Sequence, residues 1–402
     1  MELKCTVQKY DWGKKGSKSS VAQLIKAAND DVQILEDESY AELWMGTHVN
    51  GPSFIKSTGE SLEKYILDNE TVLGNEVSEM YGKSLPFLFK VLSIGKALSI
   101  QAHPDKQLAE NLHKLQPNIY KDPNHKPEIA IALTNFEALC GFRPVSEIQY
   151  FLKIIPEMCI VIGENVAHDF IGTDEANSRI HLQKCIQGLL THHADSLEGQ
   201  LLNFLERLSQ MDECSREELN ASLFEKLHAD FPGDVGCFGI YFFNWITLKP
   251  GEALFLAPNE PHAYLSGDCV ECMACSDNVV RAGLTPKLKD VPTLIEMLTY
   301  KCESGATKKF NPTRLDDFTQ VFRPPIEDFA VAKIELPPGT MTYNLIPIKS
   351  AGILIIIQGT IESSNQSFNK GSVLFIPAYE KINLKILNNN VQTLMFMAFT
   401  NI

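Results

Sequence analysis

The chain has 402 residues, of which 44% are hydrophobic and 21% are charged, and its formal net charge at pH 7 is −14. This length is too great for one ordinary core and predicts two or three domains, while the ordinary globular composition argues against disorder. The acidic charge and the lack of a basic stripe argue against nucleic acid as a partner, although a few local cations would suffice for a small phosphorylated substrate.

Apolar runs and cysteines indicate the cellular compartment of the protein. The sequence has no apolar run long enough for a membrane span, and its N-terminal segment lacks the apolar core of a signal peptide. The ten cysteines are scattered, and several lie in apolar runs. We therefore expect reduced, buried thiols in a cytoplasmic protein that does not bind a membrane.

Strand-like runs with Gly and Pro punctuation fill residues 1–145, and residues 84–92 and 97–101 predict two strands joined at 94–96. Residues 146–232 differ, because their apolar residues recur at helical spacing. The clearest sets are Ile148, Phe151, Leu152 and Ile155, and then Leu197, Leu201, Phe204, Leu205 and Leu208. This pattern predicts a helical domain inserted into a β domain.

The strand pattern returns after residue 232. Residues 238–248 are dense in aromatic and β-branched residues and predict a strand, followed by a turn at 249–252 and a second strand at 253–257. Residues 352–359 predict a buried strand in a last β unit. We expect one β domain from 1–145 and 233–300, a helical insertion at 146–232, and a C-terminal β domain at 301–402.

An internal repeat supports two related β units. Residues 250–258 and 370–377 both read as a turn glycine, an apolar strand and a proline, about 120 residues apart. Four residues beyond Pro258 is His262, whereas four residues beyond Pro377 is Lys381. We expect the first unit to carry a metal and the second to be structural.

Four residues form a candidate metal site. Gln101 and His103 are two apart, so on a strand their side chains share one face. Glu128 follows a proline that extends the backbone, and His262 lies beyond the helical segment. A single histidine is more often a hydrogen-bonded structural residue, but the joint pattern favours a divalent metal with room for a substrate oxygen.

These residues lie in longer blocks that resemble the type I mannose-6-phosphate isomerase family. The blocks follow the family's order over nearly the whole chain, with weaker likeness in the helical segment and after about residue 300. They are YDWG at 10–13, AELWMGTH at 41–48, QAHPDK at 101–106, HKPE at 125–128, PHAYLSG at 261–267, ECMA at 271–274 and SDNVVRAGLTPK at 276–287.

The resemblance implies a mainly β fold with two cupin (jelly-roll β-barrel) units and an α-helical domain inserted in the first, which is the unit that holds the metal. It implies one Zn²⁺ per chain, bound by Gln101, His103, Glu128 and His262, with Arg281 as a catalytic residue. The expected activity interconverts mannose 6-phosphate and fructose 6-phosphate and supplies GDP-mannose synthesis and glycosylation. We expect a small sugar phosphate as the partner of a monomeric chain.

Isomerisation of this kind moves a proton between C1 and C2 through an enediolate, which a divalent cation and Arg281 would stabilise. The base stays open among Glu271, Lys126, His48 and Asp277, with Glu271 favoured. Ser99, Lys126 and Lys287 are the expected phosphate contacts. The full expectation is Arg281, Glu271 and Lys126 as catalytic residues, and Ser99, Tyr264, Asp277 and Lys287 as substrate contacts.

Two other functions fit parts of the pattern. A cupin that binds a sugar phosphate or a metal without catalysis would need the barrel, but has little need of Arg281 and the lysines. An iron oxygenase could use two histidines and a carboxylate, but Gln101 as a ligand argues against it. The cysteines at 269, 272 and 275 lack a fourth partner, so we expect no iron–sulfur cluster.

Overall fold

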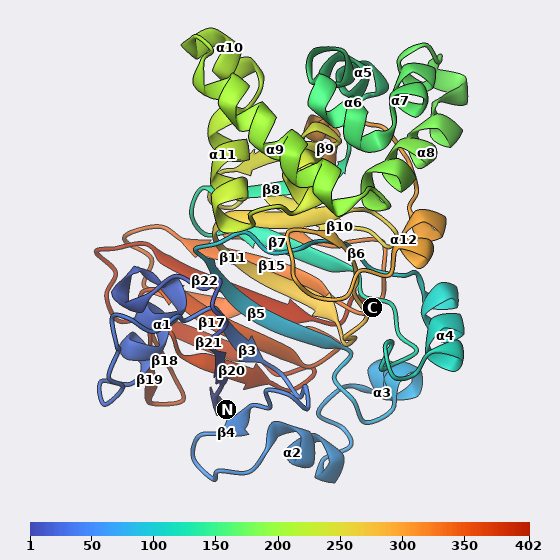
Figure 1. The fold of residues 1–402 in the computed structure, drawn as a ribbon. Helices are drawn as coiled ribbons and strands as arrows, with labels where there is room; N and C mark the ends of the chain where they lie inside the picture. The colour runs from blue at the N-terminus through green and yellow to red at the C-terminus, as the bar shows by residue number, and fades with distance from the viewer.

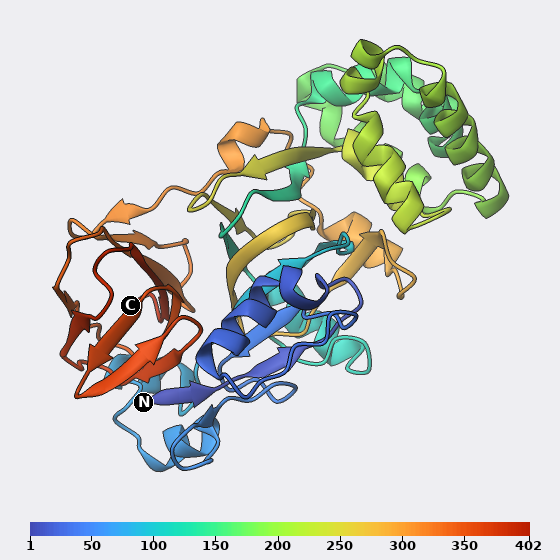
Figure 2. The ribbon, with the colours of Figure 1, turned by 90° about the vertical axis from the view of Figure 1, so that its left-hand side faces the viewer.

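The computed structural model describes the backbone of residues 1–402 and every side chain except those of Ala194 and Asp195. A helical domain stands over one end of the first β unit (Figure 1), and the second β unit lies beside the first (Figure 2). Viewed from the side, the C-terminal unit and the helical domain lie at opposite ends of the molecule (Figure 2). The expected mainly β fold with a helical insertion is therefore confirmed.

The first β unit is organised around β11, a strand of 13 residues that pairs with β6 and β8 in its first part and with β5 and β7 in its second. Gly267 lies where the partners change, at φ +107°, and a Cβ there would lie 2.5 Å from the Asn135 carbonyl oxygen. The strands are β2 (Thr6–Gln8), β3 (Glu42–Met45), β5 (Phe87–Ile94), β6 (Ile100–Ala102), β7 (Glu128–Ala132), β8 (Phe136–Phe142), β9 (Phe243–Leu248), β10 (Ala253–Leu256), β11 (His262–Ala274) and β12 (Val280–Gly283).

The helical domain runs from Val145 to Asp230, and the apolar residues that predicted it lie in its core. Its helices are α5 (Val145–Ile154), α6 (Pro156–Ile162), α7 (Glu164–Ile171), α8 (Ser178–Leu190), α9 (Ala194–Ser209), α10 (Glu213–Glu218) and α11 (Ala221–Asp230). Within the described part of the chain, none of the helices combines the length and the apolarity that crossing a membrane requires.

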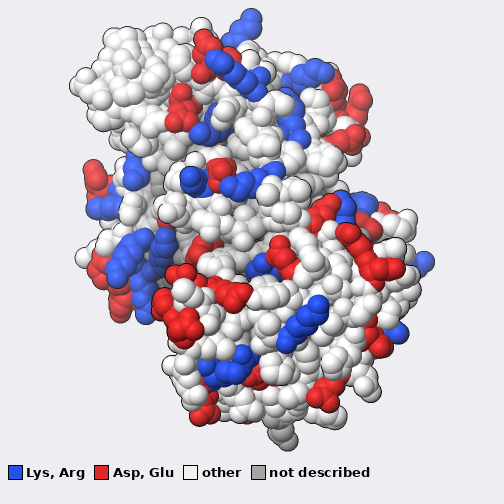
Figure 3. All heavy atoms as spheres, turned by 90° about the horizontal axis from the view of Figure 1, so that it is seen from above, with Lys and Arg blue, Asp and Glu red and all other residues white. Residues whose placement is uncertain are grey.

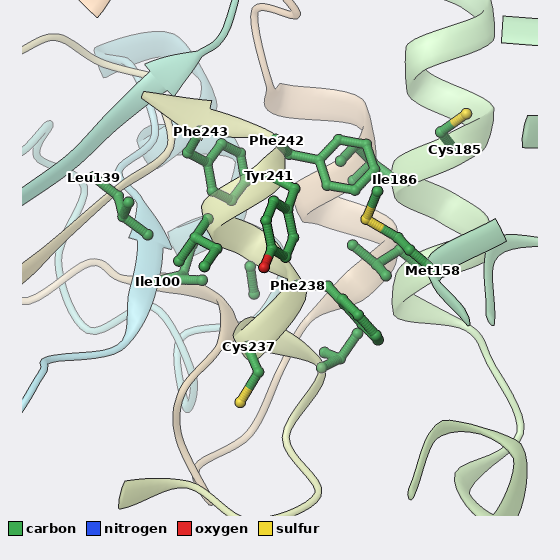
Figure 4. Packing of buried hydrophobic residues seen from close by; sticks show 14 of the residues in the cluster. Ile100, Leu139, Met158, Cys185, Ile186, Cys237, Phe238, Tyr241, Phe242 and Phe243 are labelled. Atoms are coloured by element: carbon green, nitrogen blue, oxygen red, sulfur yellow. The ribbon is translucent and has the colours of Figure 1, made fainter. Parts of the chain in front are cut away.

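A buried aromatic segment joins the helices to the strands. The sequence predicts a strand over 238–248, but residues Val235–Tyr241 form a 3-10 helix and only β9 is a strand. Figure 4 shows Phe238, Tyr241 and Phe242 between Ile100 on the β side and Met158 on the helical side. These aromatic residues are buried between the helical layer and the β layer. Composition alone cannot distinguish such a buried segment from a buried strand.

The second β unit has two sheets around a core of its own. Its strands are β13 (Thr313–Arg314), β14 (Thr319–Phe322), β15 (Ala330–Leu336), β16 (Thr342–Leu345), β17 (Gly352–Gln358), β18 (Thr360–Ser363), β19 (Gln366–Asn369), β20 (Val373–Ile376), β21 (Ile382–Ile386) and β22 (Thr393–Phe399). The N-terminal β1 (Glu2–Lys4) pairs with β20, and β4 (Phe54–Ile55) pairs with β1, so both belong to this sheet.

The repeat seen in the sequence is also a repeat of backbone conformation. Gly251 and Gly371 have φ of 86° and 85°, and Asn259 and Tyr379 both have φ of 62°. Since each pair is 120 residues apart, the position equivalent to His262 is Ile382 rather than Lys381. The second unit thus has an aliphatic side chain where the first has a histidine.

The remaining helices and the surface complete the architecture. The shorter helices are α1 (Ser20–Ala28), α2 (Leu62–Asp68), α3 (Asn75–Tyr81), α4 (Lys106–Leu115) and α12 (Val291–Met297), and there are further 3-10 turns at Gly16–Lys18, Glu175–Asn177 and Gly305–Lys308. On the face seen from above, basic and acidic side chains are interspersed (Figure 3).

Candidate metal centre and substrate cleft

Two histidines and a carboxylate meet in the interior of the first β unit. His103, Glu128 and His262 are each at most 2% exposed, and one ligand atom from each lies within 4.8 Å of the others. The Nε2 atoms of His103 and His262 lie 3.4 Å and 3.5 Å from Oε2 of Glu128. This is a donor set that suits zinc and related divalent cations.

The hydrogen bonds of the two histidines orient their rings toward one point. His103 Nδ1 donates to the Asn278 carbonyl oxygen at 2.7 Å, and His262 Nδ1 donates to the Glu260 carbonyl oxygen at 3.0 Å. A neutral ring that donates from Nδ1 has its lone pair on Nε2. Both Nε2 atoms are buried without a hydrogen-bond partner. Buried polar atoms are rarely unpaired, so these two atoms fit metal ligands.

A tight turn brings the two histidine segments together. Asn259, in the left-handed conformation, donates its backbone N–H to the His103 carbonyl oxygen at 2.7 Å. Its side chain exchanges two hydrogen bonds with Asp105, of 2.8 Å and 3.2 Å. The residues just before His262 are thereby fixed against those just after His103.

Gln101 lies beside the triad through strand register. It is the cross-strand partner of His262 on β11 and of Arg281 on β12. Directly opposed residues on neighbouring strands point to the same face. Gln101 Oε1 accepts a hydrogen bond from Ser99 Oγ at 3.2 Å. The geometry places Gln101 with the triad, although only the other three residues form the close cluster.

The triad borders a cleft of about 740 Å³. Of the residues proposed from the sequence, all except His103 and His262 line this cleft, and those two lie just beneath it. The lining includes Ser99, Gln101, Lys126, Glu128, Tyr264, Glu271, Asp277, Arg281 and Lys287, together with His48. Segments from all parts of the first unit therefore meet at one opening.

The structure adds a buried charge network that the sequence analysis missed. Lys90 is 6% exposed, and its Nζ lies 3.1 Å from Glu271 Oε2 and 3.5 Å from Glu42 Oε2. Glu42 also accepts a hydrogen bond from the Trp44 indole, and Glu271 accepts one from the Tyr264 hydroxyl at 2.8 Å. The signal was a single lysine within the apolar strand β5, because a buried cation requires anionic partners.

Two expected residues are held in other pairs. Lys126 Nζ lies 3.0 Å from Glu128 Oε1, so this lysine neutralises the metal-site carboxylate. Asp277 lies 3.2 Å from His48 Nε2, and this hydrogen bond lowers the pKa of the Asp277 carboxyl. Lys126 lines the cleft beside the triad, and its expected roles as a catalytic residue and as a phosphate contact stay predictions.

Burial and charge set the protonation states of the site. Burial, assisted by the charge on Lys126, lowers the pKa of His103 to about 4. Burial opposes ionisation of Glu128, but Lys126 and His103 outweigh it and hold the pKa of this carboxyl well below its usual range. Burial raises the pKa of Glu271, and Lys90 opposes this change. The site thus combines a neutral ring at His103, an ionised carboxylate at Glu128 and a carboxyl at Glu271 whose pKa is raised.

Comparison with known proteins places this site in a family. The family model described as phosphomannose isomerase type I, catalytic domain, matches residues 1–145, and the model of the helical insertion domain of the same type matches residues 161–243. Mannose-6-phosphate isomerase of Homo sapiens is 47% identical over 400 residues, which cover 96% of this chain and 95% of that protein. Mannose-6-phosphate isomerase 1 of Arabidopsis thaliana is 44% identical over 396 residues, which cover 95% of this chain and 90% of that protein.

Solved structures agree in fold. The apo form of mannose 6-phosphate isomerase from Salmonella typhimurium superimposes with a TM-score of 0.83 at 30% sequence identity, covering 100% of this chain and 99% of that one. A mannose 6-phosphate isomerase bound with zinc and yttrium gives a TM-score of 0.84 at the same identity and coverage. From this agreement in sequence, fold and site, the chain belongs to the type I phosphomannose isomerase family and is an enzyme of that family.

Proposed function

We propose that this chain interconverts mannose 6-phosphate and fructose 6-phosphate as a zinc-dependent aldose–ketose isomerase, by proton transfer between C1 and C2 through a cis-enediolate. The observation that carries the proposal is the pair of buried, unpartnered Nε2 atoms facing Glu128 beneath a cleft with several cations. Relatives named mannose-6-phosphate isomerase support the substrate, and a zinc-bound structure of one supports the metal.

His103, Glu128 and His262 would hold one zinc ion, with Gln101 beside them as the fourth ligand. When bound, zinc would supply a Lewis acid that makes the C–H next to the carbonyl more acidic and offsets developing negative charge. Lys126 holds Glu128 by an ion pair of 3.0 Å, and so fixes the ligand carboxylate in position.

Glu271 is the favoured group for moving the proton. Burial raises the pKa of its carboxyl, which brings the group closer to the working pH of a general base. The Tyr264 hydroxyl and the Lys90 ammonium hold its two oxygens in place. Arg281 lines the same cleft and would stabilise the oxyanion of the enediolate. Asp277 and His48 remain candidates for a second proton transfer.

The phosphate of the substrate would bind in the same cleft. Ser99 and Lys287 line it, offering a hydroxyl donor and an ammonium. The other parts of the proposal rest on the family resemblance: two cupin barrels, a monomer in the cytoplasm, and a product used for GDP-mannose synthesis and glycosylation.

The test is isomerase activity toward mannose 6-phosphate before and after removal of metal by a chelator. We expect loss of activity on chelation and recovery on addition of zinc. No activity in the zinc-replete protein would favour a non-catalytic sugar-phosphate binder. Activity that persists after verified metal removal would contradict the metal-dependent mechanism.

A further inference from the structure

Three cations line the cleft without a carboxylate partner among the described residues: Lys96, Arg281 and Lys287. They differ in this from Lys90 and Lys126, each of which is ion-paired with a glutamate. In a chain with net charge −14, unpaired cations gathered in one cleft create a local site for an anion.

Strand topology places two of these cations at one end of the cleft. In the antiparallel pair of β6 and β12, Ile100 at the start of β6 is opposite Gly283 at the end of β12. The segment before Ile100 and the segment after Gly283 therefore leave the sheet at the same edge. Lys96 lies on the first and Lys287 on the second, whereas His103 follows the other end of β6.

Lys96 is held so that its ammonium stays available. Its backbone N–H donates to the Trp12 carbonyl oxygen at 3.0 Å. Its Nζ lies 4.5 Å from the centroid of the Phe231 ring, at cation–π distance. This contact fixes the ammonium without a conventional hydrogen bond, so the N–H groups that do not face the ring remain as donors for a ligand.

The segment that carries Phe231 also fixes the other side of the cleft. Phe231 follows α11, which ends beside the strands of the first unit (Figure 1). Three residues later, Asp234 accepts hydrogen bonds from the backbone N–H groups of Leu284 at 2.6 Å and Thr285 at 3.3 Å. This exit segment of the helical insertion, residues 231–234, thus contacts both the Lys96 side and the Lys287 side.

We infer that Lys96 is a further contact for the phosphate of the substrate, opposite Lys287 and close to Ser99, and that Phe231 is its positioning residue. The inference rests on the proposed function, since it assigns this end of the cleft to the phosphate. It gives the helical insertion a role in substrate selection, because the insertion holds one of the cations that would distinguish a sugar phosphate from a free sugar.

The test compares Lys96→Gln with Lys226→Gln in the zinc-loaded protein. Lys226 is an exposed lysine on α11 that does not line the cleft, so its replacement makes the same charge change. The affinity for inorganic phosphate is measured by calorimetry, and KM and kcat are measured with mannose 6-phosphate. We expect Lys96→Gln to weaken phosphate binding and raise KM about 10- to 100-fold, because a charge-assisted hydrogen bond is lost. The control Lys226→Gln should change neither phosphate affinity nor KM. In Lys96→Gln, kcat should stay within about threefold of the wild-type value.

Phe231 supplies a second, independent variant. Phe231→Leu keeps an apolar side chain but removes the ring, and should weaken phosphate binding about three- to tenfold, while Phe231→Trp restores it. Phosphate affinity and KM that are unchanged in Lys96→Gln, in an active wild-type background, would overturn the inference. Wild-type protein without isomerase activity would instead overturn the proposed function, and phosphate binding would still report on Lys96.

Discussion

At the residue scale, the site is defined by how its buried charges are compensated. Lys90 is neutralised by two glutamates, and Glu128 is neutralised by Lys126. For His103, the attraction of Glu128 for a protonated ring does not outweigh the cost of burying that charge, so the ring stays neutral. Neutral imidazole next to an ionised carboxylate is the state that a divalent cation requires of its ligands.

This arrangement predicts an acid-sensitive metal-free protein. The pKa of His103 is about 4 in the folded chain and near 6.5 when unfolded, so the unfolded state binds more protons between these values. The free energy of unfolding should therefore fall as pH falls from 6.5 to 4, by about 3 kcal/mol. The depressed pKa of Glu128 acts in the same direction at lower pH.

Urea unfolding of chelator-treated protein at pH 7 and at pH 4.5 measures this loss. His103→Asn serves as the control, because it removes the titrating ring and should lose less stability over the same range. An equal loss in both proteins would show that other groups dominate the acid sensitivity.

At the element scale, the same turn and strand conformation occurs in both β units, with different neighbouring residues. Both copies begin with a glycine near φ +85° and continue into a buried strand, β10 or β20. Their surroundings differ. A Cβ at Gly371 would lie 1.9 Å from the Leu24 carbonyl oxygen, whereas at Gly251 the nearest atom is Lys333 Nζ at 3.0 Å, the end of a flexible side chain.

The pair Gly251→Ala and Gly371→Ala should separate backbone strain from steric contact. Both carry the cost of a left-handed alanine, about 1 kcal/mol. Only Gly371→Ala also displaces α1, so it should be destabilised by at least about 2 kcal/mol more. Chemical denaturation of the two variants measures the difference, and equal destabilisation would mean that α1 shifts without cost.

At the scale of the whole molecule, the two β units share a hydrophobic core. Phe89 and Val270 of the first unit belong to the same buried cluster as Ile353 and Phe375 of the second. The pairing of β1 with β20 links the N-terminus to the second unit, as the side view also shows (Figure 2). A shared core predicts that the two units unfold together.

Replacement of Phe375 tests this coupling. Phe375 is fully buried, so Phe375→Ala should cost about 3–5 kcal/mol. All three tryptophans, at positions 12, 44 and 245, lie in the first unit and report on its unfolding alone. We expect Phe375→Ala to lower the midpoint temperature of the unfolding transition followed by tryptophan fluorescence, although Phe375 lies in the second unit.

The control is Leu387→Ala, at an exposed position of the second unit, which should leave the fluorescence transition in place. If Phe375→Ala shifts circular dichroism but not tryptophan fluorescence, the units unfold independently and the shared core does not couple them.

The sequence by itself determined the family, the helical and β segments, and the candidate ligands Gln101, His103, Glu128 and His262, because each of these leaves a local signal in periodicity or in a short block. It erred over residues 238–241, which were predicted as strand but form part of a 3-10 helix, because burial between two layers imitates strand composition. The tertiary structure alone decided the partners of Lys90, the placement of Lys96 by Phe231, and the core between the β units. These contacts join segments far apart in the chain, and their energy arises only when both sides are buried together, so neither segment carries the information alone.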